Sequence, residues 1–422
     1  MTQPTGSESL ASQWRLAQVG SRDFAAHPRE VRSFVPFPLF SKALGSPVLI
    51  PAGTPFSPDD ITFFQGKHSG RTLAEAIGEA DLVVSCPHAG DAIPEEIAEF
   101  LAPGFTHRLQ SDYSDRTTGP ICQAWAALDS RILFVQNPHP RLLRDPNRAR
   151  PDDLGPQLRE AFARVRAAGA WNRVDLTGVD TIRPVTFSFY PLLKVPETDT
   201  ELEHMVAVFT DVASRGLEVY EKTRDKLRNA VLESTTARIA GTGQPGHVFT
   251  LSFHDTMNHT TTSDGAVNVE RAEPDKLPAV AALSNRGDEN GERRGEEVIT
   301  MDPEMLRVLA DCHRAGFKTT DPAAVTLNKP YLGSQEIVAA GTLFRSLTDS
   351  TFRKAIGSSE LAVGAVQAEF LREFLIGEAA TKELLQPGTG WPKEDPAWTM
   401  KLAHACKTSW DGFRTSLAEA TK

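Results

Sequence analysis

Residues 81–90, DLVVSCPHAG, form a short apolar run that stops at Pro-His-Ala-Gly. An apolar run of this length, closed by proline and glycine, is typical of a buried β-strand that ends in a loop. Downstream, Pro94 is suited to the first turn of a helix, and apolar residues recur at helical spacing as far as Leu101. The stretch therefore predicts a buried strand, a loop at His88 and then a helix.

Three more apolar runs have the length of buried strands: 131–136 (RILFVQ), 247–253 (HVFTLSF) and 360–370 (ELAVGAVQAEF). Residues 201–235 have helical spacing, with Gly216 separating two helices or kinking one, and a further helix opens at Asp302. Strands that alternate with helices in this way predict an α/β fold. We expect a mixed, mostly parallel sheet with helices on both faces.

Composition narrows the class of protein. The 422 residues include 45 Lys and Arg against 55 Asp and Glu, a formal net charge of −10, which disfavours nucleic acid or an anionic membrane as a partner. Four cysteines without CxxC spacing argue against a disulfide framework or a thiolate zinc site. The first residues do not resemble a secretory signal, and no run approaches the ~20 apolar residues of a membrane span. We expect a cytoplasmic enzyme whose oligomeric state the sequence leaves open.

The chain divides into three parts by pattern. Residues 1–80 carry prolines among short apolar pieces and predict an N-terminal extension or a small lobe. Residues 81–385 hold the strand and helix alternation of a catalytic domain. Residues 386–422 contain three tryptophans and predict a helical tail that packs on the catalytic domain.

Two histidines directly follow predicted strands, His88 after the first and His254 after the run at 247–253. Either histidine serves as a hydrogen-bonded structural residue or as a metal ligand. Two neutral imidazoles and one carboxylate form a catalytic zinc site that keeps an open position for water. The third ligand is available in SDYSD (111–115), where Asp112 or Asp115 either binds the metal or caps the following helix.

Two further clusters offer binding and catalytic groups. Residues 141–150 hold four arginines and one asparagine, which form either a solvated surface or a receiver for an anionic substrate group. Glu369 ends a strongly apolar strand, where a carboxylate is costly unless it is paired or used. It either forms a structural ion pair with Arg372 or acts as general base to a metal-bound water.

Taken together, these clusters resemble the N-formylglutamate amidohydrolase family. The resemblance rests on six motifs in the family's order and extends over about residues 82–380. The motifs are SCPHAGDAIP (85–94), SDYSD (111–115), DPNR (145–148), SFHDTM (252–257), NKPYLGS (328–334) and QAEFLR (367–372). The resemblance implies a zinc-peptidase-like α/β fold, related to carboxypeptidases and aspartoacylases. It also implies metal-dependent hydrolysis of a small N-acyl amino acid such as N-formylglutamate.

The resemblance assigns a metal centre. It implies that His88 and His254 bind Zn²⁺ or another divalent transition metal, with Asp115 as the third ligand and Asp112 as the alternative. It implies that Glu369 is the base that activates water and later protonates the leaving amine.

The resemblance also assigns a substrate site. It implies that Asn147 and Arg148 hold the substrate α-carboxylate and that Arg141 assists them. Ser252 stands where the family usually has an acid, two residues before the later histidine, and Lys329 replaces the commoner Asp. Two alternatives follow: a metallo-carboxypeptidase or N-acyl amidase acting on a larger substrate, or a catalytically silent relative that binds an acidic ligand.

Overall fold

The computed structural model describes residues 39–169, 172–348 and 361–420. Its centre is a seven-stranded sheet that contains the four strands predicted from the apolar runs. In spatial order the strands are β11 (Val325–Leu327), β10 (Ala281–Ser284), β12 (Leu361–Leu371), β7 (Gly246–Thr256), β4 (Leu82–Cys86), β6 (Ile132–Gln136) and β3 (Thr62–Phe63).

The four central strands, β12, β7, β4 and β6, run parallel to one another. At the margins, β10 is antiparallel to β12 and parallel to β11, and β3 is antiparallel to β6. The prediction of a mixed, mostly parallel sheet is confirmed. Because the central strands share one direction, their C-terminal ends meet at one edge of the sheet, where functional groups of open α/β folds gather.

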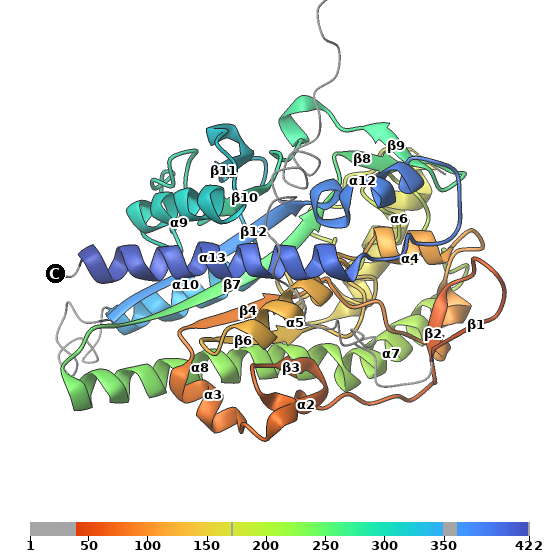
Figure 1. Cartoon of the computed structure of the whole chain (residues 1–422). Coiled ribbons are helices and arrows are strands. Elements are labelled where there is room, and N and C mark those ends of the chain that lie inside the picture. The colour runs from red at the N-terminus through yellow and green to blue at the C-terminus, as the bar shows by residue number, and fades with distance from the viewer. Residues whose placement is uncertain (1–38, 170–171, 349–360, 421–422) are drawn as a thin grey trace, which may run out of the picture.

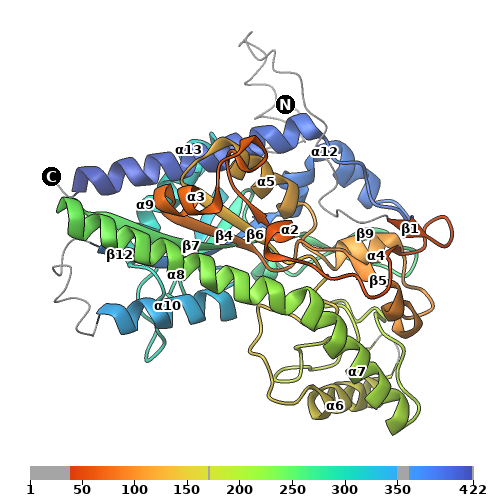
Figure 2. The same ribbon diagram turned by 90° about the horizontal axis from the view of Figure 1, so that it is seen from below.

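Helices cover both faces of the sheet. One face carries α5 (Thr118–Leu128), α9 (Pro303–Gly316), α12 (Arg372–Leu384) and α13 (Pro396–Ala420) (Figure 1). The other carries α3 (Leu73–Glu79), α8 (Leu217–Thr242) and α10 (Gln335–Thr348). In Figure 2, α8 and α10 lie on the side of the sheet away from α13. Side chains of a strand alternate between the faces. In β4, Val84 packs in the core under α5 and α13, and Val83 packs in the core under α8.

A lobe lies beyond the edge at which the parallel strands end (Figures 1 and 2). It has its own buried cluster, formed by side chains of its helices, short strands and loops. Its elements are β1 (Phe40–Ser41), β2 (Val48–Ile50), β5 (Ile93–Pro94), η2 (Glu95–Phe100), α4 (His107–Asp112), α6 (Leu154–Ala168) and α7 (Asp199–Arg215). The elements of the described chain that belong neither to the sheet, nor to the helices that cover it, nor to this list are α2 (Pro58–Ile61), η1 (Lys67–Ser69), β8 (His259–Thr261), β9 (Val267–Glu270), η3 (Glu273–Asp275) and η4 (Pro322–Ala324).

Two of the predicted helix features are confirmed and one is wrong. Gly216 separates α7 from α8, and the side chain of Asp302 caps α9. The helix predicted from Pro94 is instead a strand residue followed by the 3₁₀-helix η2, although Ile97 and Phe100 are buried as the spacing indicated. Pro94 pairs with β2, and this pairing holds it in extended backbone.

The C-terminal helix α13 is part of the main core. Trp410 and Phe413 pack against Phe249 of β7, with ring centroids 6.1 and 5.3 Å away. The division into residues 1–80, 81–385 and 386–422 stays a prediction, and residues 1–38 of its first part lie outside the described residues. Within the described ranges, no helix combines the length and the apolar character that a membrane crossing requires.

Candidate metal centre

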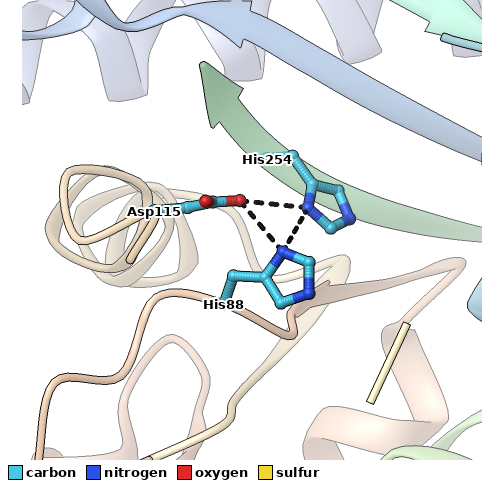
Figure 3. A group of neighbouring side chains, drawn as sticks. All are labelled: His88, Asp115 and His254. Carbon is cyan, nitrogen blue, oxygen red and sulfur yellow. Dashed lines mark hydrogen bonds and ion pairs between the residues drawn. The ribbon is translucent and has the colours of Figure 1, made fainter. Parts of the chain in front are cut away.

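Three buried side chains from distant parts of the chain converge at the C-terminal edge of the sheet. His88 Nδ1 and His254 Nδ1 are 3.2 Å apart, and Asp115 Oδ2 lies 3.0 Å from the nitrogen of His254 and 3.4 Å from that of His88. Figure 3 shows the three groups pointing toward one another. Two imidazole nitrogens and one carboxylate oxygen form the donor set that zinc and related divalent transition metals prefer.

The fold positions each member of this cluster. His88 lies in the loop that leaves β4, and its backbone carbonyl accepts a hydrogen bond from the backbone N–H of Asp115 at 2.8 Å. His254 lies near the end of β7, where it alternates with the core residue Phe253 and therefore points to the opposite face. Strand ends and one backbone hydrogen bond thus bring the three side chains together.

His88 is oriented by a second aspartate. Its Nε2 lies 2.7 Å from Asp145 Oδ1, and Arg141 bonds the other oxygen of Asp145. Burial raises the pKa of Asp145, but Arg141 and His88 outweigh burial and hold the pKa well below its usual value. An ionised Asp145 accepts the Nε2 proton of His88, which leaves the Nδ1 lone pair facing Asp115 and His254.

The charges in the cluster are consistent with a bound cation. Burial raises the pKa of Asp115, but His88 and His254 lower it far more, and the carboxylate stays ionised. Burial and Arg141 lower the pKa of His88, whereas Asp145 and Asp115 raise it to above its usual value. A positive charge is therefore favoured between these groups, and a divalent ion supplies one without protonating the imidazoles.

Asp115, rather than Asp112, belongs to the cluster. The carboxylate of Asp112 bonds Arg372 and the hydroxyl of Thr261. The N-cap of α5 is Thr117, without a side-chain capping bond, so the alternative that either aspartate caps this helix is not observed.

Glu369 lies beside the cluster without an ion pair to Arg372. Its Oε1 accepts a hydrogen bond from Thr256 Oγ1 at 2.6 Å, and its Oε2 accepts one from Gln367 Nε2 at 3.2 Å. Arg372 instead pairs with Asp255 and Asp112. The ion pair suggested by the spacing of Glu369 and Arg372 is therefore not formed.

A cavity opens next to Asp115. It is lined by Asp112, Tyr113, Asp115, Arg141, Thr186, Phe187, Ser188, Asp255, Thr256, Met257, His259, Thr260, Thr261, Arg271 and Arg372. The Nε atoms of Arg141 and Arg271 are buried and have no hydrogen-bond partner within the described ranges. A larger cavity of about 600 Å³, between α6 and residues 184–197, is lined by none of the predicted site residues.

The three predicted substrate-binding residues all contact Asp145, but their other contacts differ. Arg141 lines the cavity. Asn147 is buried on the other side of His254, where its Nδ2 bonds Gln367 Oε1 at 3.1 Å. Arg148 bonds Asp180 at 2.8 Å through its Nε.

Sequence reasoning missed several polar residues that surround the cluster: Asp145, Arg271 and Glu336. Asp145 is the first residue of the DPNR motif, three residues before Arg148, so the motif could have identified it as a site residue. Arg271 directly follows the short strand β9 and Glu336 lies in the first turn of α10, and neither segment has the apolar run that marked His88 and His254.

Comparison with known families supports the sequence resemblance. A family model described as N-formylglutamate amidohydrolase matches residues 80–374, a range that includes every predicted site residue. No curated protein and no solved structure gives a significant match to the chain. Because the match extends over well more than half of its length, the chain belongs to the N-formylglutamate amidohydrolase family.

Proposed function

We propose that this protein is a metal-dependent amidohydrolase that cleaves the amide bond of a small N-acyl amino acid such as N-formylglutamate. Family membership supports an amidohydrolase that acts on N-formylglutamate-like substrates. The observation that carries the metal dependence is the convergence of His88 Nδ1, His254 Nδ1 and Asp115 Oδ2 in a buried cluster.

His88, His254 and Asp115 are the proposed ligands of Zn²⁺ or another divalent transition metal. When bound, such an ion supplies Lewis acidity to water and to the carbonyl oxygen of the substrate. Three protein ligands leave a coordination position for these groups, as in other catalytic zinc sites. The hydrogen bond from His88 to Asp145 supports this role because it holds the ligand nitrogen free of its proton.

Glu369 is the proposed general base. It is 7% exposed and lies on β12 next to His254, and the hydrogen bonds from Thr256 and Gln367 fix both of its oxygens. In the proposed reaction Glu369 takes a proton from water as the water oxygen attacks the amide carbon. Glu369 then gives this proton to the amide nitrogen, the C–N bond breaks, and the acyl group leaves as a carboxylic acid such as formic acid.

The cavity beside the cluster is the proposed substrate site. Arg141 and Arg271 line it, and their buried Nε atoms have no hydrogen-bond partner among the described residues, which supports binding of a substrate carboxylate there. Arg148 is also proposed to hold a carboxylate, and to do so its guanidinium has to exchange Asp180 for the substrate. Asn147 does not line this cavity; its side chain bonds Gln367 and the backbone N–H of Glu336, and its proposed role is to fix these groups beside the cluster.

A panel of N-acyl amino acids, assayed with and without a chelator, tests the proposal. We expect turnover of N-formylglutamate or a close analogue, loss of turnover with the chelator, and about one metal ion per chain. Turnover only of longer N-acyl or peptide substrates would favour the carboxypeptidase or larger-amidase alternative. Absence of both turnover and bound metal would favour the silent relative and overturn the proposal.

A further inference from the structure

A hydrogen-bond chain leads away from the far side of His254. His254 Nε2 lies 2.9 Å from Ser252 Oγ, and Ser252 Oγ lies 2.8 Å from Glu336 Oε2 on α10. Ser252 and His254 are two residues apart on β7 and therefore share one face of the sheet. All three residues are buried.

Glu336 is held from several sides. Its Oε2 also accepts a hydrogen bond from Ser85 Oγ at 2.7 Å, and its Oε1 accepts one from Tyr220 Oη at 2.6 Å. Arg224 forms an ion pair with Oε1, and the backbone N–H of Glu336 donates to Asn147 Oδ1 at 3.0 Å. A carboxylate that receives this many donors is an acceptor only, and its position is fixed.

The direction in which the Ser252 hydroxyl donates its single proton determines which ring nitrogen of His254 is protonated. An ionised Glu336 cannot donate, so the 2.8 Å contact requires that Ser252 donates to Glu336. The Ser252 oxygen is then free to accept, and its 2.9 Å contact requires a proton on His254 Nε2. That tautomer leaves the Nδ1 lone pair pointing at His88 and Asp115.

Asn147 offers a competing donor to the same nitrogen. Its Nδ2 lies 3.3 Å from His254 Nε2, and it also donates to Gln367 at 3.1 Å. If Nδ2 donated to His254, the imidazole would carry its proton on Nδ1, against His88 and Asp115. The shorter contact with Ser252 and the anionic charge of Glu336 favour the Nε2-protonated form.

We propose that Glu336 is a positioning residue that acts through Ser252 to hold His254 with its proton on Nε2 and its Nδ1 free for a metal ion. The role toward metal rests on the proposed function. His88 and His254 would then be oriented alike, the first directly by Asp145 and the second by a carboxylate relayed through a hydroxyl.

Ser252→Ala and Ser85→Ala form a matched pair that tests this relay. Both remove a hydroxyl that donates to Glu336 Oε2, but only Ser252 contacts His254. The affinity for zinc is measured by competition with a chromophoric chelator, and stability by thermal unfolding. We expect Ser252→Ala to weaken zinc binding by roughly 10–100-fold, the range for losing an outer-shell partner. Ser85→Ala should leave affinity nearly unchanged, and Ser252→Thr should restore it. Equal affinities for the two alanine variants would overturn the proposal.

The tautomer of His254 is measured directly in the metal-free protein. Histidine labelled with ¹⁵N is observed by NMR well above the ordinary imidazole pKa of ~6.5, and the His254 signal is identified by its loss in His254→Gln. We expect a proton on Nε2 in the wild type and a mixture of tautomers in Ser252→Ala. A wild-type proton on Nδ1 would overturn the relay. This measurement needs neither metal nor turnover, so failure of the relay is distinguishable from failure of the proposed amidohydrolase function.

Discussion

His254 and Glu369 lie directly opposite one another on adjacent parallel strands, as Cα partners in the register of β7 and β12. Paired residues of neighbouring strands point to the same face of the sheet, and their backbones lie one strand spacing, ~4.8 Å, apart. The imidazole of His254 and the carboxylate of Glu369 therefore leave the same face from adjacent strands. A proposed ligand and the proposed base are thus held by the sheet itself. Their separation depends on strand pairing rather than on a loop.

Glu369→Gln should remove turnover and leave metal binding intact. The amide keeps the shape of the side chain but cannot take a proton from water, so we expect kcat to fall by roughly 10²–10⁴-fold. Steady-state kinetics and metal analysis of the purified variant check this. Glu378→Gln, at the exposed ion pair with Lys382 on α12, is the control and should keep wild-type kcat. Wild-type kcat in Glu369→Gln would remove Glu369 from the chemistry.

Arg271→Gln should mainly raise KM for a carboxylate-bearing substrate. Loss of one hydrogen bond to a charged group costs about 1.5–3 kcal/mol, which corresponds to roughly a 10–100-fold rise in KM. Arg148→Lys tests the other predicted carboxylate receiver by the same assay. An unchanged KM in either variant would exclude that arginine from substrate binding, and a fall in kcat alone would point to a role outside binding.

Strand ends made the core of the site predictable. His88 and His254 each follow an apolar run, and parallel strands bring such positions to one edge, so their meeting follows from the fold class. The choice of Asp115 over Asp112 required coordinates, because both stand in one short segment. The structure shows that the backbone N–H of Asp115 bonds the carbonyl of His88 and that the Asp115 carboxylate turns toward both histidines.

Other features depend on contacts that local sequence does not encode. The spacing of Glu369 and Arg372 suggested an ion pair, but the chain passes from β12 to α12 after Leu371, and Arg372 turns to Asp255. The carboxylate of Glu336, on α10, is linked to His254 through the Ser252 hydroxyl on β7. Long-range relays of this kind leave no period or motif in the sequence.

Metal should stabilise the folded chain through the three clustered side chains. A ligand that binds only the folded state adds about 2.7 kcal/mol to the free energy of unfolding at a hundredfold excess over its Kd. We therefore expect zinc to raise the Tm of the metal-free protein and a chelator to reverse the rise. His254→Ala should abolish the response to zinc. A zinc-dependent Tm shift that survives His254→Ala would place the bound ion elsewhere.

Arg414, which joins α13 to the sheet, should make the free energy of unfolding depend on pH. This buried guanidinium pairs with Asp81 at the start of β4 and with Asp129 at the end of α5. Burial raises the pKa of both carboxyls, but His247 and Arg414 at Asp81, and Arg414 and Arg131 at Asp129, outweigh burial and lower the pKa. Because these pKa values are lower in the folded state, their stabilisation is present above the unfolded-state pKa of ~3.9 and is lost as pH falls through the folded-state values.

Arg414→Leu should therefore destabilise the protein at neutral pH by about 3–5 kcal/mol, since it leaves two buried carboxylates without their shared partner. The difference from wild type should shrink in acid, where both aspartates become protonated. Urea unfolding at neutral pH and at a pH below the unfolded-state pKa measures both effects. Lys407→Gln is the control on the same helix, because its ion pair with Asp411 is partly exposed and contributes only ~0–1 kcal/mol. A pH-independent loss in Arg414→Leu would mean that packing of the side chain, rather than its charge, joins α13 to the sheet.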